Sequence, residues 1–282
     1  MTRPTASCIA VAMSLCIASF ARAQQATPAD DASRMLAMHA HDTPAASGAV
    51  HHPRGEVVSD TVVYATVDGK PVRGFRSRPR DARKDAPAII LVHEWWGLND
   101  NIRGMAAQYA GEGYVALAVD LYGTVAPTPD SAAKLYRFVM ENPEPARANL
   151  SGAIDFLRSQ GAKKVGTVGW CFGGHWSLEA GLVGGSRVQA VVMYYGQPIT
   201  DPKQLEQLDA PLLGLFGSQD TGIPADSVKA MAAVLDRLNK NETLQFFDAG
   251  HGFANPSGKN YNPEAADTAW KHALEFFAHY LK

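Results

Sequence analysis

The chain has 282 residues, of which 46% are hydrophobic and 19% are charged. This apolar content is enough for one large core, and α/β domains of this size are often single. Lys and Arg number 26 against 28 Asp and Glu, a formal net charge of -2. There is no basic excess to neutralise phosphates, so we expect no nucleic-acid partner.

The first 23 residues have the pattern of a secretory signal peptide. Arg3 supplies a positive start, residues 9–20 are mostly apolar, and Ala21-Arg22-Ala23 fits the small-x-small rule for cleavage before Gln24. We therefore predict a signal peptide over residues 1–23 and a secreted or periplasmic protein, with an uncleaved anchor as the alternative. No later apolar run has membrane-spanning length, so we expect no stable membrane insertion after cleavage.

Residues 24–55 are rich in Ala, Pro, Asp, Ser and His and lack apolar periodicity. This composition predicts a flexible leader between the signal peptide and the folded domain. Four histidines of the leader could bind a metal, but their irregular spacing does not favour a metal site. They are His39, His41, His51 and His52.

Signal cleavage leaves the mature chain with a single cysteine. Cys8 and Cys16 leave with the signal peptide, and only Cys171 stays. A lone cysteine cannot form an internal disulfide, even in an oxidising compartment. Cys171 is therefore either buried and inert or kept for its reactivity.

The remaining residues, 56–282, alternate between short apolar runs and amphipathic segments. Strands are expected at Thr61–Val67, Val72–Arg76, Ala88–Val92, Val115–Val119, Val165–Val168, Val188–Tyr194, Pro211–Phe216 and Thr243–Phe247. Helices are expected at Asn101–Glu112, Asp130–Glu141, Ala146–Gln160, Gly174–Leu182, Ala225–Lys240 and Pro263–Leu281. We predict one α/β domain with a mostly parallel central sheet, helices on both faces and an N-terminal antiparallel hairpin.

Residues 169–174, Gly-Trp-Cys-Phe-Gly-Gly, lie between a predicted strand and a predicted helix. This is the nucleophile elbow of the α/β-hydrolase fold, with Cys171 in the serine position. Small residues are needed because the sharp turn strains the backbone and brings neighbouring side chains into collision. The helix dipole favours a thiolate, and the backbone N–H of Phe172 can stabilise an oxyanion. A buried, inert cysteine beside a glycine turn is the alternative.

A thiol nucleophile needs a base, and hydrolases of this fold order the partners as nucleophile, acid, histidine. Asp220 and His251 each follow a predicted strand, at the sheet edge where open α/β sheets carry their sites. We predict that His251 acts as base and acid while Asp220 fixes its tautomer. The alternatives are a turn cap for Asp220 and a surface loop position for His251.

Together these residues resemble the dienelactone hydrolase family of α/β-hydrolases, and the resemblance runs from about Val57 to the C-terminus. The matching motifs are His93-Glu94-Trp95-Trp96-Gly97, Asp120-Leu121-Tyr122, Gly169 to Gly174, Tyr194-Tyr195-Gly196, Gly217-Ser218-Gln219-Asp220 and Ala249-Gly250-His251-Gly252-Phe253.

The resemblance implies that Cys171, Asp220 and His251 form a catalytic triad. It also implies that Glu94 lies by the cysteine and helps to generate the thiolate, and that Trp95 gives the second oxyanion N–H. Glu94 could instead bind local backbone amides. A negative group beside a resting thiol would raise the thiol pKa, which protects a lone cysteine from oxidation.

Two arginines that hold the substrate carboxylate in the family are replaced here by Thr124 and Asn255. Their loss removes the main anion anchor of the family pocket. Arg76, Arg103 and Lys259 are the candidates for a replacement.

Aromatic residues could line a less charged pocket, although ordinary core packing is the more common role for each. The candidate substrate-binding residues are Trp96, Tyr122, Tyr195 and Phe253.

We therefore expect a monomeric hydrolase that cleaves a small-molecule ester or lactone through a cysteine acyl-enzyme. This chemistry requires no metal and no organic cofactor. Three alternatives stay open: a thioesterase or peptidase on the same fold, a non-catalytic ligand-binding protein, and a redox thiol protein.

Overall fold

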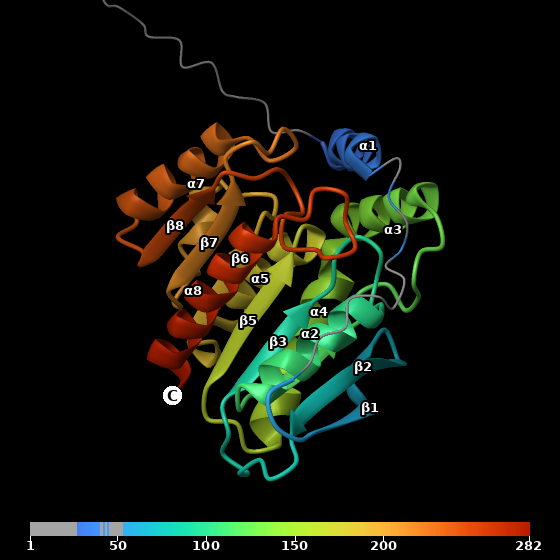
Figure 1. Ribbon diagram of the computed structural model, residues 1–282, viewed down its shortest axis with the longest axis vertical. Coiled ribbons are helices and arrows are strands. Elements are labelled where there is room, and N and C mark those ends of the chain that lie inside the picture. The colour runs from blue at the N-terminus through green and yellow to red at the C-terminus, as the bar shows by residue number, and fades with distance from the viewer. Residues whose placement is uncertain (1–26, 40–41, 43, 45–52) are drawn as a thin grey trace, which may run out of the picture.

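The computed structural model describes residues 27–39, 42, 44 and 53–282 (Figure 1). The predicted signal peptide, residues 1–23, lies outside the described residues, as do parts of the predicted leader. Within the described part of the chain, none of the helices is both long enough and apolar enough to cross a membrane.

An eight-stranded sheet forms the centre of the molecule, with the strand order β1-β2-β4-β3-β5-β6-β7-β8. The strands are β1 (Val57–Val67), β2 (Lys70–Pro79), β3 (Ala88–Val92), β4 (Val115–Val119), β5 (Val165–Trp170), β6 (Ala190–Tyr194), β7 (Leu212–Gly217) and β8 (Glu242–Phe247). β2 pairs antiparallel with β1 and β4, and the other neighbours are parallel. The predicted α/β architecture with an N-terminal antiparallel hairpin is confirmed.

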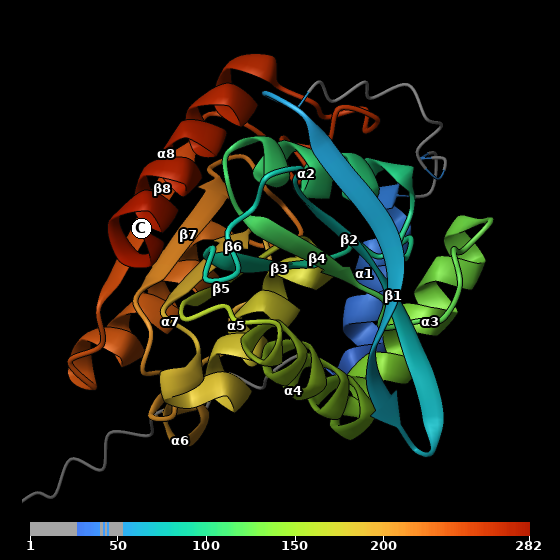
Figure 2. The same ribbon diagram turned by 90° about the horizontal axis from the view of Figure 1, so that it is seen from below.

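Helices cover both faces of this sheet. They are α1 (Pro28–His39), α2 (Asp100–Gly111), α3 (Pro129–Glu141), α4 (Pro143–Ser159), α5 (Phe172–Gly184), α6 (Pro202–Leu205), α7 (Ala225–Arg237) and α8 (Pro263–Leu281), with a 3₁₀ turn at Gly185–Arg187. Figure 2 shows α2 and α8 on one face and α4 and α5 on the other. The short helix α6 and the 3₁₀ turn were not expected from the sequence.

The central strands are buried on both sides. Every residue of β3, β5, β6 and β7 is buried, as their continuous apolar runs predict. Because these strands are parallel, their carboxyl ends meet at one edge of the sheet, and α1 and α3 lie toward that edge (Figure 1). The loops after β5, β7 and β8 therefore converge there.

The N-terminal segment differs from the flexible leader that composition predicts, because residues 28–39 form the helix α1. Thr27 and Asp30 cap its start reciprocally: each side chain accepts a hydrogen bond from the other residue's backbone N–H, at 3.2 and 3.1 Å. Ala32 and Met35 are buried, and α1 packs against α3. A helix of this length is marginal alone, so burial of its apolar face stabilises it.

Candidate active site

The predicted nucleophile lies on a tight strand-to-helix turn. β5 ends at Trp170, α5 begins at Phe172, and Cys171 between them has φ of 56°. A Cβ atom added to Gly169 would lie 1.9 Å from the carbonyl oxygen of Gly173. Such contacts are too short for any side chain, so this backbone path requires glycine at position 169. The elbow geometry that the sequence predicts is present.

The structure brings Cys171, His251 and Asp220 together in one connected row. His251 Nε2 lies 3.2 Å from Cys171 Sγ, and His251 Nδ1 lies 2.7 Å from Asp220 Oδ2. Because Nδ1–H donates to the carboxylate, the lone pair of the neutral ring lies on Nε2, facing the thiol. All three residues are buried, with exposed fractions of 4–6%. This arrangement can move the thiol proton to the imidazole.

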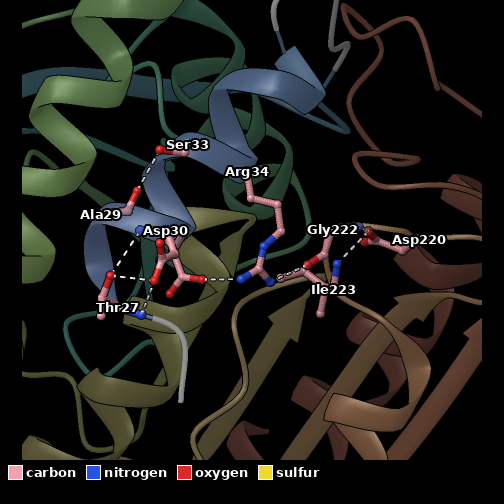
Figure 3. Close-up of polar contacts among 9 residues, drawn as sticks. Thr27, Ala29, Asp30, Ser33, Arg34, Asp220, Gly222 and Ile223 are labelled. Carbon is pink, nitrogen blue, oxygen red and sulfur yellow. Dashed lines mark hydrogen bonds and ion pairs between the residues drawn. The ribbon is translucent and has the colours of Figure 1, made fainter. Parts of the chain in front are cut away.

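The second carboxylate oxygen of Asp220 is fixed by its own loop. Asp220 Oδ1 accepts hydrogen bonds from the backbone N–H groups of Gly222 and Ile223, each at 2.8 Å (Figure 3). Arg34 of α1 donates to the carbonyl oxygen of Gly222 at 3.2 Å and to Asp31 at 2.8 Å. The same turn that orients Asp220 therefore also holds α1 in place.

The Cys171 thiol is held in its neutral form. Burial raises its pKa well above the ordinary value, and the negative charge that Glu94 carries when it is ionised adds to the effect. Hydrogen bonds from the backbone N–H groups of Phe172 and Trp95 act in the opposite direction. These two amides therefore point toward the sulfur, where the predicted oxyanion donors need to be.

Glu94 lies beside Cys171 and lines the same small cavity. Burial raises its pKa to about 8, and the charge of Asp42 contributes in the same direction. Asn255 Nδ2 donates a hydrogen bond of 2.6 Å to Glu94 Oε2. At pH 7 the Glu94 carboxyl is thus mostly protonated. Asn255, at the position where the family resemblance implies an arginine for the substrate carboxylate, binds the carboxyl of Glu94 instead.

Two small cavities and one larger groove meet at the triad. A cavity of about 20 Å³ touches His39, Glu94, Trp96, Cys171 and Lys259, and one of about 10 Å³ lies between Met35, Cys171 and Tyr195. A groove of about 670 Å³ lies beside His251, and α1 residues and Lys259 also line it. The sulfur itself has little open space around it.

The structure divides the predicted aromatic lining into two groups. Trp96 and Tyr195 line the cavities next to Cys171. The ring of Tyr122 packs against that of Phe172, with centroids 5.1 Å apart, and the fully buried Phe253 packs 5.2 Å from Tyr195. Tyr122 and Phe253 therefore support the walls of the site, which is the core-packing alternative.

Of the three cations considered as replacement anchors, only Lys259 lies at the site. Arg76 forms a two-point ion pair with Asp60 on the β1–β2 hairpin, at 2.6 and 3.0 Å. Arg103 lies over the ring of Phe75. Lys259 lines both the groove and the cavity at Cys171.

His39 and Asp42 of the leader were not predicted to lie at the catalytic centre, yet both line the cavity at Cys171. His39 Nδ1 is 2.7 Å from Asp42 Oδ2, and burial lowers the pKa of His39. Its ring lies 4.6 Å from that of Trp95 and 5.5 Å from that of His251. The capping pattern Thr27-Pro28-x-Asp30 and the apolar residues that follow were the available signal for α1.

The family model and the sequence relatives point to one family, and the solved structures show a shared fold. The model of the dienelactone hydrolase family matches residues 72–281. An Escherichia coli K12 protein named "Putative carboxymethylenebutenolidase" is 30% identical over 260 residues, covering 84% of this chain and 93% of that protein. Protein usf of Aquifex pyrophilus is 31% identical over 224 residues, covering 76% and 96%. The dienelactone hydrolase-like promiscuous phosphotriesterase P91, from metagenomic libraries, shares the fold with a TM-score of 0.74 at 22% identity, covering 81% and 100%.

Proposed function

The chain belongs to the dienelactone hydrolase family of hydrolases, and from this premise we propose that it cleaves a carboxylic ester or lactone through an acyl-thioester on Cys171. The observation that carries the proposal is the connected row from Cys171 Sγ through the His251 ring to Asp220, with contacts of 3.2 and 2.7 Å. Neither contact would be needed by a buried, inert cysteine.

In the first half of the reaction, His251 Nε2 takes the thiol proton and the sulfur attacks the substrate carbonyl carbon. The oxyanion accepts hydrogen bonds from the backbone N–H groups of Phe172 and Trp95, which already point at the sulfur. The tetrahedral intermediate then expels the alcohol oxygen, which takes the proton from His251. Cys171 is left as a thioester.

In the second half, His251 takes a proton from water, and the resulting hydroxide attacks the thioester carbon. Collapse of this intermediate breaks the C–S bond, releases the carboxylic acid and returns the proton to the sulfur. Asp220 keeps Nδ1 of His251 protonated and stabilises the imidazolium that forms in each half. We propose, as the family resemblance implies, that Glu94 helps to form the thiolate once substrate is bound; in the resting site its negative charge raises the thiol pKa instead.

Substrate entry requires more room than the resting site provides. Pockets for small molecules are typically about 300–1,000 Å³, whereas the cavity at Cys171 is about 20 Å³. The neighbouring groove of about 670 Å³ is large enough, and His39 lines both spaces. A shift of His39 would join them, and Lys259 would then face any carboxylate on the substrate.

The test is steady-state hydrolysis of short-chain aryl esters and enol-lactones by the native protein and by Cys171→Ala and His251→Ala variants. Both variants should lose turnover by 10³-fold or more. His279→Ala, which removes an exposed histidine on α8, is the matched control and should keep native rates. Equal turnover by native protein and Cys171→Ala refutes the proposal, and a panel with thioesters and peptides separates the other hydrolytic activities.

We further propose that the protein acts in the periplasm or outside the cell. The support is the signal-like pattern of residues 1–23, together with the single cysteine that would survive cleavage. N-terminal sequencing of the protein from cell fractions should give Gln24 as the first residue of an exported form. A cytoplasmic protein that keeps its first residues would contradict the proposal.

A further inference from the structure

A second histidine–carboxylate pair faces the sulfur of Cys171. His39 Nδ1 lies 2.7 Å from Asp42 Oδ2, and His251 Nδ1 lies 2.7 Å from Asp220 Oδ2. Because each Nδ1–H donates to a carboxylate, each neutral ring keeps its lone pair on Nε2. The Nε2 atom of His39 is buried and has no hydrogen-bond partner among the described residues. A buried nitrogen of this kind is uncommon without a bound partner.

The three donor atoms are close enough to share one ion. One ligand atom from each of His39, Cys171 and His251 lies within 4.8 Å of the other two, and His251 Nε2 is 3.2 Å from the sulfur. Tetrahedral zinc, with Zn–N of about 2.0 Å and Zn–S of about 2.3 Å, places its ligand atoms roughly 3.3–3.7 Å apart. A movement of the His39 ring by about 1 Å therefore completes the geometry.

We propose that His39, Cys171 and His251 bind one zinc ion, which inhibits hydrolysis by holding both the nucleophile and the base. One thiolate and two imidazoles are a ligand set that zinc prefers and that magnesium and calcium avoid. The adjoining cavity of about 20 Å³ has room for one water as a fourth ligand. Binding replaces the S–H bond of Cys171 by a S–Zn bond and releases the proton to solvent.

The surroundings of the three ligands favour a cation. Histidines that bind metals usually donate their other ring N–H to a carboxylate, which orients the ring and strengthens its donor atom. Asp42 and Asp220 do this for the two rings, and Asp220 is itself held by two backbone amides. These two carboxylates and the thiolate outweigh the one positive charge of Lys259, which lines the same cavity.

The inference goes beyond the proposed function because it gives His39 and Asp42 a role that hydrolysis does not require. It also makes the two separable: His39 takes no part in acyl transfer, whereas Cys171 and His251 serve both. Because His39 also lies between the cavity and the groove, a His39 variant can change the metal-free rate through substrate access. Zinc sensitivity is therefore measured against each variant's own metal-free rate, and the His39 variant should lose it.

The test starts from the full native protein, freed of metal by EDTA and dialysis. ZnCl₂ is titrated into this protein in a calorimeter to measure zinc binding. The rate of aryl-ester hydrolysis is then measured at each zinc concentration. We expect one zinc per chain and matching inhibition. His39→Ala should weaken zinc binding by at least tenfold and raise the inhibitory zinc concentration equally. Asp42→Asn should weaken binding by roughly tenfold through the lost carboxylate, and His279→Ala is the matched histidine control. CoCl₂ provides a second readout, because a Co–thiolate absorption band should appear in native protein and disappear in Cys171→Ala.

Circular dichroism of each variant verifies that the helix content is kept, and Asp42→Asn provides a milder change if His39→Ala unfolds. Equal zinc affinity in native protein, His39→Ala and Asp42→Asn overturns the proposal, as does a cobalt spectrum without a thiolate band. Zinc stoichiometry and the cobalt band do not depend on turnover, so a protein that binds zinc but hydrolyses no ester would contradict only the proposed function.

Discussion

Glu94 provides a quantitative test of the buried site, because replacing it by glutamine removes an ionisable group without changing its shape. The folded protein holds the pKa of Glu94 at about 8 against an ordinary value of 4.5, chiefly through burial. Each pKa unit corresponds to about 1.4 kcal/mol. The native fold therefore loses about 3 kcal/mol at pH 7 and about 5 kcal/mol at pH 9 by keeping this carboxyl out of water.

The sign of the effect follows from the direction of the shift. A raised folded-state pKa gives stability that is fully present below pH 4.5 and is lost as the pH rises through about 8. Glutamine stays neutral, and its carbonyl oxygen can still accept the hydrogen bond from Asn255. The free energy of unfolding of Glu94→Gln should therefore exceed that of the native protein by an amount that grows with pH, beyond a constant offset.

Urea unfolding at pH 4.5, 7 and 9 measures this difference, with Glu275→Gln on the exposed face of α8 as the matched control. The Glu94→Gln difference should grow by about 3 kcal/mol between pH 4.5 and 7 and by about 4 kcal/mol between pH 4.5 and 9, while the control stays flat. A Glu94→Gln difference that does not change with pH would refute the argument, since Glu94 would then titrate as it does in the unfolded chain.

Three further predictions concern the triad, the elbow and α1. Asp220→Asn should lower kcat on aryl esters by about 10³–10⁴-fold, because an amide favours the wrong tautomer of His251, and a loss below tenfold would contradict this role. Gly169→Ala should lower Tm by roughly 5–10 °C, because its methyl group would lie 1.9 Å from the carbonyl oxygen of Gly173. Gly250→Ala is the control and should change Tm little, because its methyl group would lie 3.8 Å from the nearest side-chain atoms. Arg34→Ala should speed iodoacetamide labelling of Cys171 by roughly tenfold, because it removes the hydrogen bond from α1 to the Asp220 turn. Unchanged labelling relative to Arg137→Ala would show that α1 does not limit access.

The sequence was sufficient to place the triad because its geometry follows from local rules and topology. The glycines around Cys171 are required sterically wherever a strand turns so sharply into a helix, so the motif itself predicts the elbow. Asp220 and His251 follow parallel strands, and parallel strands bring their carboxyl ends to one edge. The order of residues along the chain therefore determines which loops meet.

The contacts around the triad could not be predicted in the same way, because they join parts of the chain that no local pattern links. Asn255 holds Glu94 across 161 positions of sequence. Nothing in either local segment indicates that partner, so the sequence showed only that an arginine was missing. The orientation of Tyr122 and Phe253 could not be predicted for the same reason. An aromatic residue next to a motif can face the cavity or the core, and only its packing in the folded chain determines which.

The N-terminal helix shows why composition alone underestimates order. Polar and small residues dominate α1, and twelve residues form a marginal helix in water. Its stability comes from contacts with the rest of the domain: Met35 is buried, and Arg34 binds the turn that also orients Asp220. Helix docking and the orientation of Asp220 therefore depend on the same turn: Arg34 binds the carbonyl oxygen of Gly222, and Asp220 accepts from the N–H groups of Gly222 and Ile223. A change that loosens one should loosen the other.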